Sequence, residues 1–248
     1  KPDLYVLSIG VSRYQDTRND LKFASIDARA IRDAFARQGQ LFNQIRYKLI
    51  TDFEATKDNI LDGLDWIDRQ TTQRDLAVIF VSGHGINHER GGYYFLPHDT
   101  DLRSLRRTGV KWLEFQDVVT NLPGKVLLLA DTCHSGDIVG KTRQALGHDI
   151  TAAIKSITAQ GTGQVIMAAS TGSTPSFEHP SWGNGAFTKA VVEGIDGQAD
   201  YDHDGIVYIR ELDLYVTKRV KALTNGEQKP TTIIPELVQD FAVGTSLN

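Results

Sequence analysis

Short, uninterrupted apolar segments constrain the fold of this chain more than any other feature. Residues 4–11 (LYVLSIGV), 76–81 (LAVIFV) and 125–130 (KVLLLA) contain almost no polar side chains. Strands that are buried on both faces have this composition, whereas strands with one face in water alternate apolar and polar residues. The three segments therefore predict parallel strands in the interior of a sheet.

The segments between these strands show helical periodicity. Within residues 20–37 the apolar side chains recur every three or four positions, and the same spacing follows Thr56, a residue type that caps helices. Further helices are predicted at residues 113–122, 150–158, 186–193 and 211–223. Further strands are predicted at residues 45–50 and 164–169 and near 241–243, with a hairpin arm at 93–97.

Alternating strands and helices of this kind predict an α/β fold with helices on both faces of the sheet. In such a fold, functional groups lie just beyond the carboxyl ends of the strands. The chain has no long linker, composition break or internal repeat, so we expect a single domain over residues 1–248. Residues 136–147 and 171–185 are rich in glycine and polar residues and are predicted to form long loops, which are often functional.

Charge and composition exclude several classes of partner. The formal net charge is −4, which favours neither nucleic acid nor an anionic membrane surface. No apolar run approaches the ~20 residues of a membrane helix, and no signal peptide is visible after Lys1. The single cysteine excludes an intramolecular disulfide and suits a reducing compartment. We therefore expect a cytoplasmic location.

Two of the predicted strands end in reactive residues. His84 follows the strand at 76–81 in the sequence SGHG, and Cys133 follows the strand at 125–130 in DTCHSG. In a parallel sheet both residues lie at the same edge, where the imidazole can take the proton of the thiol. The adjacent glycines leave room for a peptide backbone, and the amides of Gly85 and Cys133 are candidates for an oxyanion hole.

Other interpretations of these residues are common in proteins. A lone cysteine after a buried strand is usually a small core residue, and a lone histidine is usually a hydrogen-bonded loop residue. A zinc site is a further alternative, but its ligand types lack the close paired spacing of zinc motifs. A cysteine and a histidine at two strand ends, each beside glycine, favour a catalytic dyad. The zinc alternative would draw on His84, His88, His98, Cys133 and His134.

The two blocks SGHG (82–85) and DTCHSG (131–136) resemble the catalytic blocks of caspase-like cysteine peptidases, most closely the metacaspase and bacterial orthocaspase branch. His84 and Cys133 are 49 residues apart, and about 50 is usual for caspases. The resemblance extends to LSIGVSRYQD near the start and to WGNGAFTKAVVEGI near residue 190. It implies a caspase-haemoglobinase-like three-layer αβα sandwich with a mostly parallel six-stranded sheet.

The resemblance also implies a mechanism. Cys133 would attack the peptide carbonyl, His84 would act as general base, and the amides of Gly85 and Cys133 would hold the oxyanion. No third catalytic residue and no cofactor would be required. The expected partners are protein or peptide substrates, and a monomer is favoured because that branch is usually monomeric.

Substrate preference follows from the same resemblance. Metacaspases cleave after Arg or Lys and bind this side chain with carboxylates, at positions that match Asp27, Asp131 and Ser82. Taken alone, Asp27 would be a solvated helix carboxylate and Asp131 a turn residue. The family has a cysteine where this chain has Ala24, a difference that affects pocket depth. Cleavage after Asp is the alternative, but the chain has no evident arginines for such a pocket.

A calcium loop is predicted near the end of the chain. Asp200, Asp202, Asp204, Gly205 and Glu211 fit the spacing of an EF-hand loop. The context is unusual because Gly197 interrupts the helix that should lead into the first aspartate. The alternative is a tight turn before a helix. A bound Ca²⁺ would act as an activator, and a calcium-binding regulatory domain is one alternative function.

Self-cleavage is predicted in the loop after the cysteine. Lys141 and Arg143 lie within residues 136–147, where an enzyme specific for basic residues could cut its own chain. They could equally be solvated charges. A further alternative function is a non-catalytic caspase-like scaffold module, although both residues of the dyad are present.

Overall fold

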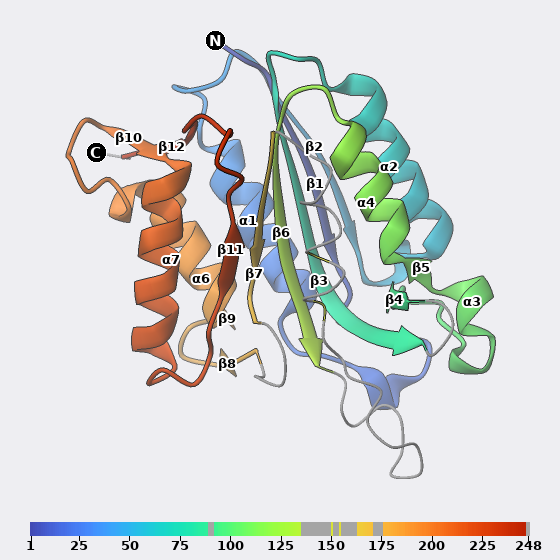
Figure 1. Ribbon diagram of the computed structural model, residues 1–248. Coiled ribbons are helices and arrows are strands. Elements are labelled where there is room, and N and C mark those ends of the chain that lie inside the picture. Colours follow the sequence, from blue (N-terminus) through green and yellow to red (C-terminus); the bar gives the residue numbers. More distant parts are fainter. Residues whose placement is uncertain (89–91, 135–149, 151–153, 155–162, 171–175, 247–248) are drawn as a thin grey trace.

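The computed structural model describes residues 1–88, 92–134, 150, 154, 163–170 and 176–246, except for the side chains of Cys133 and His134. Its centre is a sheet that helices cover on both faces (Figure 1). Neighbouring strands from β7 to β2 are parallel, and β11 is antiparallel to β7. In spatial order, the main path is β11 (Thr231–Ile233), β7 (Gln164–Ala168), β6 (Lys125–His134), β3 (Leu76–His88), β1 (Leu4–Gly10) and β2 (Ile45–Thr51).

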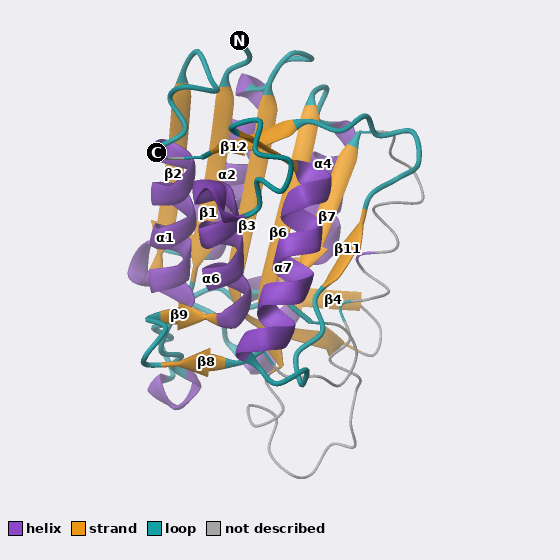
Figure 2. Ribbon diagram, turned by 90° about the vertical axis from the view of Figure 1, so that its left-hand side faces the viewer, coloured by secondary structure: helices purple, strands orange, loops and turns teal. Residues whose placement is uncertain are grey.

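The helices form two layers. On one face lie α1 (Ala24–Ala36), α6 (Ala186–Glu193) and α7 (Ile209–Leu223), and on the other lie α2 (Lys57–Gln70) and α4 (Trp112–Asn121) (Figures 1 and 2). Alternate residues of β1 enter separate cores: Leu4 and Val6 pack with α1, and Tyr5 and Leu7 pack with α2. The predicted three-layer αβα fold with a mostly parallel sheet is confirmed.

Local signals place the helix starts. The Thr56 hydroxyl accepts a hydrogen bond from the amide of Asn59 (3.3 Å) and caps α2 as predicted. The residue before α1 gives no side-chain cap, and the hydroxyl of Ser12 instead accepts from the amide of Ser25 (2.8 Å). The loop after β1 is thereby joined to the start of α1. The predicted helix at 150–158 lies almost entirely outside the described residues.

Two strands are longer than the sequence pattern predicts. β3 continues through the SGHG block to His88, and β6 continues through Cys133 to His134. The reason is tertiary: β4 (Gly92–Phe95), the predicted hairpin arm, pairs with the second half of β3. The short strand β5 (Val110–Lys111) pairs with β4 and widens the sheet further. His84 and Cys133 therefore lie within strands and not beyond their ends.

The last predicted strand belongs to a different sheet. β12 (Ala242–Thr245) pairs with β10 (Ile206–Tyr208), and β8 (Glu178–His179) pairs with β9 (Asn184–Gly185). No described helix has the length and apolar character needed to cross a membrane. The remaining elements are α3 (Leu105–Thr108), the 3₁₀ turns Thr17–Asn19, Asp52–Glu54 and Leu102–Ser104, and the π-helical turn η4 (Gly194–Gln198).

Candidate active site

The two predicted dyad residues are neighbours across the sheet. His84 of β3 is in register with Cys133 of β6, and two residues earlier Ser82 is in register with Asp131. Adjacent strands lie about 4.8 Å apart, so the backbones of each pair are close. The structure therefore brings the histidine and the cysteine together at the level of the backbone, while the thiol lies outside the described side chains.

Hydrogen bonding assigns the two nitrogens of the buried His84 ring. Nε2 lies 2.8 Å from the carbonyl oxygen of Asn19. Because a carbonyl can only accept, Nε2 carries the proton in this contact. Nδ1 is buried and has no hydrogen-bond partner among the described residues. The ring therefore has a lone pair on Nδ1, which is the nitrogen that can act as a base.

Burial also sets the charge of His84. Desolvation lowers the pKa of the imidazole to about 4, although the hydrogen bond to Asn19 acts in the opposite direction. The ring is neutral at pH 7 as a result. A neutral imidazole can accept a proton, whereas an imidazolium cannot.

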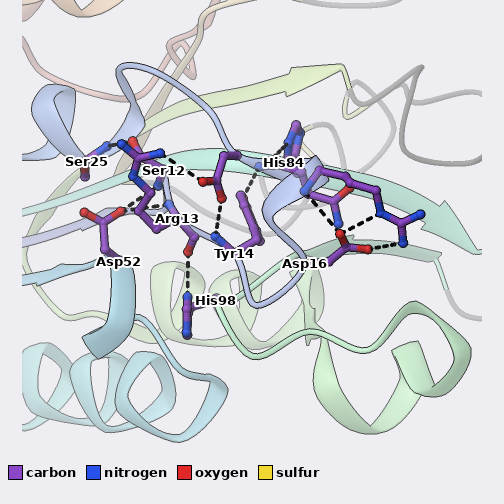
Figure 3. Close-up of polar contacts among 11 residues, drawn as sticks. Ser12, Arg13, Tyr14, Asp16, Ser25, Asp52, His84 and His98 are labelled. Carbon is purple, nitrogen blue, oxygen red and sulfur yellow. Dashed lines mark hydrogen bonds and ion pairs between the residues drawn. The ribbon is translucent and has the colours of Figure 1, made fainter.

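The loop between β1 and α1 surrounds His84 (Figure 3). The hydroxyl of Tyr14 accepts a hydrogen bond from the His84 amide (2.9 Å), and the centroids of the two rings are 5.1 Å apart. Asn19, in the same loop, accepts from the ring itself. This loop therefore positions both the backbone and the imidazole of His84.

Side chains from two other segments hold the loop in place. Asp52 Oδ1 accepts from the amides of Ser12 (2.9 Å) and Arg13 (3.0 Å) (Figure 3). His98 Nδ1 lies 2.6 Å from the Arg13 carbonyl oxygen and donates to it. Asp52 has a φ of 50°, a conformation that few residues other than glycine adopt. His98, one of the possible zinc ligands in the sequence, is thus bound to the backbone.

Gly85, the predicted oxyanion residue, lies beside the dyad. It is in register with His134 of β6 and with Phe95 of β4. The Tyr93 hydroxyl packs against Gly85 and donates to Thr132 Oγ1 (2.8 Å). Gly85 thus lies at the point where β4 and β6 meet β3.

Asp27 and Asp131, the predicted specificity residues, are buried side by side next to Gly185, and we refer to their surroundings as the carboxylate pocket. They come from α1 and β6, and 2% and 3% of their surface is exposed. A Cβ placed on Gly185 would lie 3.1 Å from Asp27 Oδ2 and 3.3 Å from Asp131 Oδ2. Both carboxylates therefore pack closely against Gly185, where a side chain would crowd them.

The two carboxylates have different polar neighbours. Asp27 accepts hydrogen bonds from Asn184 Nδ2 (2.8 Å) and from the Gly185 amide (3.2 Å). Asp131 accepts from the hydroxyls of Ser176 (3.0 Å) and Thr188 (3.4 Å). These groups come from residues 176–188, so this segment forms one wall of the pocket.

Burial raises the pKa of both carboxyls. Desolvation is the largest cause for Asp27, and the charge of Asp131 raises the pKa further, against the hydrogen bonds of Asn184 and Gly185. Desolvation likewise raises the pKa of Asp131, against the bonds from Ser176 and Thr188. Two buried carboxylates without a cation repel each other, and such a site gains stability when a cation enters.

A third carboxylate, not predicted from the sequence, belongs to the same pocket. Glu178 of β8 lies opposite Gly185 of β9. Desolvation and the charge of Asp131 raise the pKa of Glu178 to about 7, and the charge of Lys22 acts against this. The available signal was composition, because Glu178 is the only acidic residue between positions 171 and 192.

Ser82 lies on the sheet next to Asp131. Its side chain is buried, and it is in register with Asp131 on one side and Gly10 on the other. A Cβ on Gly10 would lie 2.3 Å from the carbonyl oxygen of Ala24. The missing side chain at Gly10 therefore lets the first turn of α1, which carries Asp27, lie directly on the sheet.

The sequence predicts two further sites. Lys141 and Arg143, the predicted self-cleavage positions, are outside the described residues. Asp200, Asp202 and Asp204 gather at the opposite end of α6 from the carboxylate pocket, and among the described residues they form the group that could hold a metal.

Comparison with known proteins gives a family and a fold. The family model of the caspase domain, a group of cysteine peptidases, matches residues 4–242. The solved structure of protein GSU0716 from Geobacter sulfurreducens superimposes with a TM-score of 0.64 at 15% identity, covering 99% of this chain and 100% of that one. At this identity the likeness shows the fold alone. No curated protein matches the chain.

Proposed function

Because this chain belongs to the caspase-domain family of cysteine peptidases, we propose that it is an endopeptidase that cleaves after arginine or lysine. The observation that carries the proposal is the cluster of the buried Asp27 and Asp131 with the half-buried Glu178, close to the His84–Cys133 pair. The pair supplies the chemistry, and the cluster selects the side chain that precedes the scissile bond.

The reaction proceeds through a thioester. His84 Nδ1 takes the proton of the Cys133 thiol, and the sulfur attacks the carbonyl carbon of the peptide bond. The amides of Gly85 and Cys133 donate to the oxyanion. The C–N bond then breaks, and the leaving nitrogen takes the proton from His84. Water, deprotonated by His84, hydrolyses the thioester and restores the thiol. None of these steps uses a metal or a cofactor.

The neutral state of His84 suits the first step. A ring with a pKa of about 4 is unprotonated at pH 7, and Asn19 holds the proton on Nε2. Nδ1 is then free of a proton when the thiol requires a base. The thiolate would stabilise the imidazolium until the sulfur attacks, and the negative charge then moves to the oxyanion until the amine departs with the proton of His84.

Electrostatics favour a basic side chain in the pocket. A guanidinium can bind a carboxylate through two parallel hydrogen bonds, and it would relieve the repulsion between Asp27 and Asp131. Glu178 adds a third negative charge when it is deprotonated. An aspartate side chain would meet like charges and lose its hydration, so the cluster disfavours a peptidase specific for aspartate.

Self-cleavage after Lys141 or Arg143 extends the proposal to the enzyme's own chain. Both residues lie in the polar segment 136–147, close in sequence to Cys133. A peptidase selective for basic residues would accept either of them. Fragments that form in the wild type, are absent in Cys133→Ala and are lost in a Lys141→Gln/Arg143→Gln double variant would support this step. Identical fragments in Cys133→Ala would contradict it.

Affinity labelling tests the proposed function. A peptidyl chloromethyl ketone with arginine beside the reactive group should alkylate Cys133, and because the chain has one cysteine, a mass shift on that thiol is unambiguous. The matched reagent with aspartate should react at least about tenfold more slowly, which corresponds to ~1.4 kcal/mol. His84→Ala should slow labelling by the arginine reagent. Equal rates for the two reagents, or a faster aspartate reagent, would contradict the proposal.

A further inference from the structure

Three aspartates form a compact group far from the proposed active site. Asp200, Asp202 and Asp204 follow the π-helical turn η4 and precede β10, and one carboxylate oxygen of each lies within 4.8 Å of the others. In Figure 1 the strands β10 and β12 lie near the N-terminus, at the opposite end of the molecule from β8 and β9. The group is therefore separate from the carboxylate pocket.

Asp200 provides a second, independent observation that points to a cation. Only 9% of this residue is exposed, and its Oδ1 is buried with no hydrogen-bond partner in the described part of the chain. Its other oxygen, Oδ2, accepts from the amide of Gly205 (3.1 Å). A buried carboxylate oxygen without a partner is costly, and this cost would disappear if Oδ1 coordinated a cation.

No described basic side chain compensates the group. Among the described residues, none of the three aspartates forms an ion pair. The ammonium group of Lys218 in α7 lies over the Tyr201 ring, 5.3 Å from its centre, and does not form an ion pair with the aspartates. Three carboxylates this close together repel one another unless a cation lies between them.

We propose that Asp200, Asp202 and Asp204 bind one Ca²⁺ ion. Calcium prefers several oxygen ligands and tolerates irregular geometry, whereas zinc prefers nitrogen and sulfur. The backbone already has a loop shape, because Gly205 has a φ of 86° and the Ile206 amide donates to Asp204 Oδ1 (2.8 Å). The Gly205 backbone and the Ile206 hydrogen bond orient the loop. Asp200 Oδ1, which has no hydrogen-bond partner among the described residues, is the atom that would coordinate the ion.

Glu211 has a positioning role in this proposal. Its Oε1 accepts from the Tyr201 amide (2.9 Å) and its Oε2 from the Tyr208 amide (3.0 Å). Both oxygens therefore hold the two ends of the loop, one beside Asp200 and one at the start of α7. The sequence predicts Glu211 as a direct ligand of the ion. Its hydrogen bonds to the Tyr201 and Tyr208 amides instead indicate that Glu211 holds the loop in shape.

The ion would stabilise the part of the fold that contains α6, η4, β10 and α7. The loop joins α6 and η4 to β10 and α7, and the Gly205 carbonyl accepts from the amide of Ser246 (3.1 Å) near the described C-terminal end. Binding to the folded loop alone raises the stability of the fold by mass action. The effect would be structural, because the loop does not contact the dyad.

Calcium titration of the Cys133→Ala protein tests the site, since this background has no thiol nucleophile. After treatment with chelator, isothermal titration with CaCl₂ should show one ion per chain, with a Kd between about 10⁻⁶ and 10⁻³ M. Saturating Ca²⁺ should also raise the thermal midpoint. Asp200→Asn, which keeps an acceptor for Gly205, should weaken binding about tenfold or more. Asp204→Ala changes an exposed residue and should do the same without loss of the fold.

Asp65→Asn is the matched control, because it removes one carboxylate from the exposed surface of α2. It should leave both the affinity for Ca²⁺ and the shift in midpoint unchanged. The proposal is overturned if the Cys133→Ala protein shows no binding heat and no thermal shift with CaCl₂. It is also overturned if Asp200→Asn and Asp204→Ala bind Ca²⁺ as tightly as the parent. Neither readout depends on peptidase activity, so the result is separate from the proposed function.

Discussion

At the scale of single residues, the buried Asp27 and Asp131 and the half-buried Glu178 bring three carboxyl groups together. Burial raises the pKa of each carboxyl, so the pocket tends to hold protons when no cation occupies it. A basic side chain of a substrate would displace those protons. Substrate preference and pH dependence should therefore have the same origin.

Asp131→Asn should remove the preference for arginine while preserving the fold. Loss of one carboxylate from a buried ion pair should lower kcat/KM for an arginine substrate by about 100-fold, or ~2.7 kcal/mol. The raised pKa means that charged Asp131 opposes folding above its ordinary range near 3.8. The variant should thus be at least as stable as the wild type at pH 8. Thermal unfolding and peptide kinetics check both points, and an unchanged kcat/KM would exclude Asp131 from the pocket.

Glu178 should control activity near neutral pH. Its pKa of about 7 means that it gains a proton as the pH falls through 7, and the pocket then loses one negative charge. We expect kcat/KM for an arginine substrate to fall on the order of tenfold between pH 8 and pH 6. In Glu178→Gln this fall in kcat/KM between pH 8 and pH 6 should be absent, and kcat/KM at pH 8 should be lower than in the wild type. A pH profile unchanged by the substitution would show that another group titrates there.

Tyr14 should matter for catalysis more than for binding. Tyr14→Phe removes the hydroxyl that accepts from the His84 amide, and leaving a buried N–H without that acceptor costs ~1–3 kcal/mol. We expect kcat to fall about tenfold with little change in KM, because the carboxylate pocket is untouched. Tyr5→Phe is the control, since its hydroxyl accepts from Arg46 and not from the site. Equal effects of the two variants on kcat would argue against positioning by Tyr14.

Residue types at the ends of two predicted strands indicated His84 and Cys133, and the resemblance to metacaspases indicated Asp27 and Asp131. The surrounding groups could not be found in the same way. Asn19 acts through its backbone carbonyl, which any residue could supply. Tyr14 and Glu178 come close to these residues only through loops whose path depends on the whole fold.

At the scale of elements, the strand ends differ from those that the sequence pattern predicts, because pairing with neighbouring strands extends them. Glycine and polar residues after position 81 read as a loop, yet pairing with β4 and β6 extends β3 to His88. The strand β11 consists of three half-buried, β-branched residues (Thr-Thr-Ile) and is too short and too polar to stand out as an apolar run. The interior strands were predictable because burial on both faces dictates their composition.

The contact between β1 and α1 depends on Gly10. Gly10→Ala places a Cβ 2.3 Å from the Ala24 carbonyl oxygen and 2.7 Å from the Ala28 Cβ, so α1 must move away from the sheet. We expect a loss of ~1–3 kcal/mol in the free energy of unfolding, together with weaker arginine selectivity because α1 carries Asp27. Gly39→Ala is the control, because a Cβ there meets no atom within 4 Å. Chemical denaturation compares the two, and equal stabilities would contradict this packing account.

At the scale of the whole molecule, distant parts of the sequence form one candidate site. The carboxylate pocket combines α1, β6 and the β8–β9 pair, and the dyad combines β3 with β6. The parallel sheet holds these elements in register, and the caspase-domain match covers nearly the whole chain. That residues 1–248 form a single domain stays a prediction, and it agrees with a site whose parts lie between positions 14 and 188.

The most direct test of the central claim is hydrolysis of four peptides that differ only in the residue before the scissile bond: Arg, Lys, Asp or Ala. Wild type and Cys133→Ala are measured in parallel, each with CaCl₂ and with chelator. The account predicts cleavage after Arg and Lys by the wild type, and none by the variant. Cleavage after Asp, cleavage without regard to that residue, or activity that survives in Cys133→Ala would contradict it.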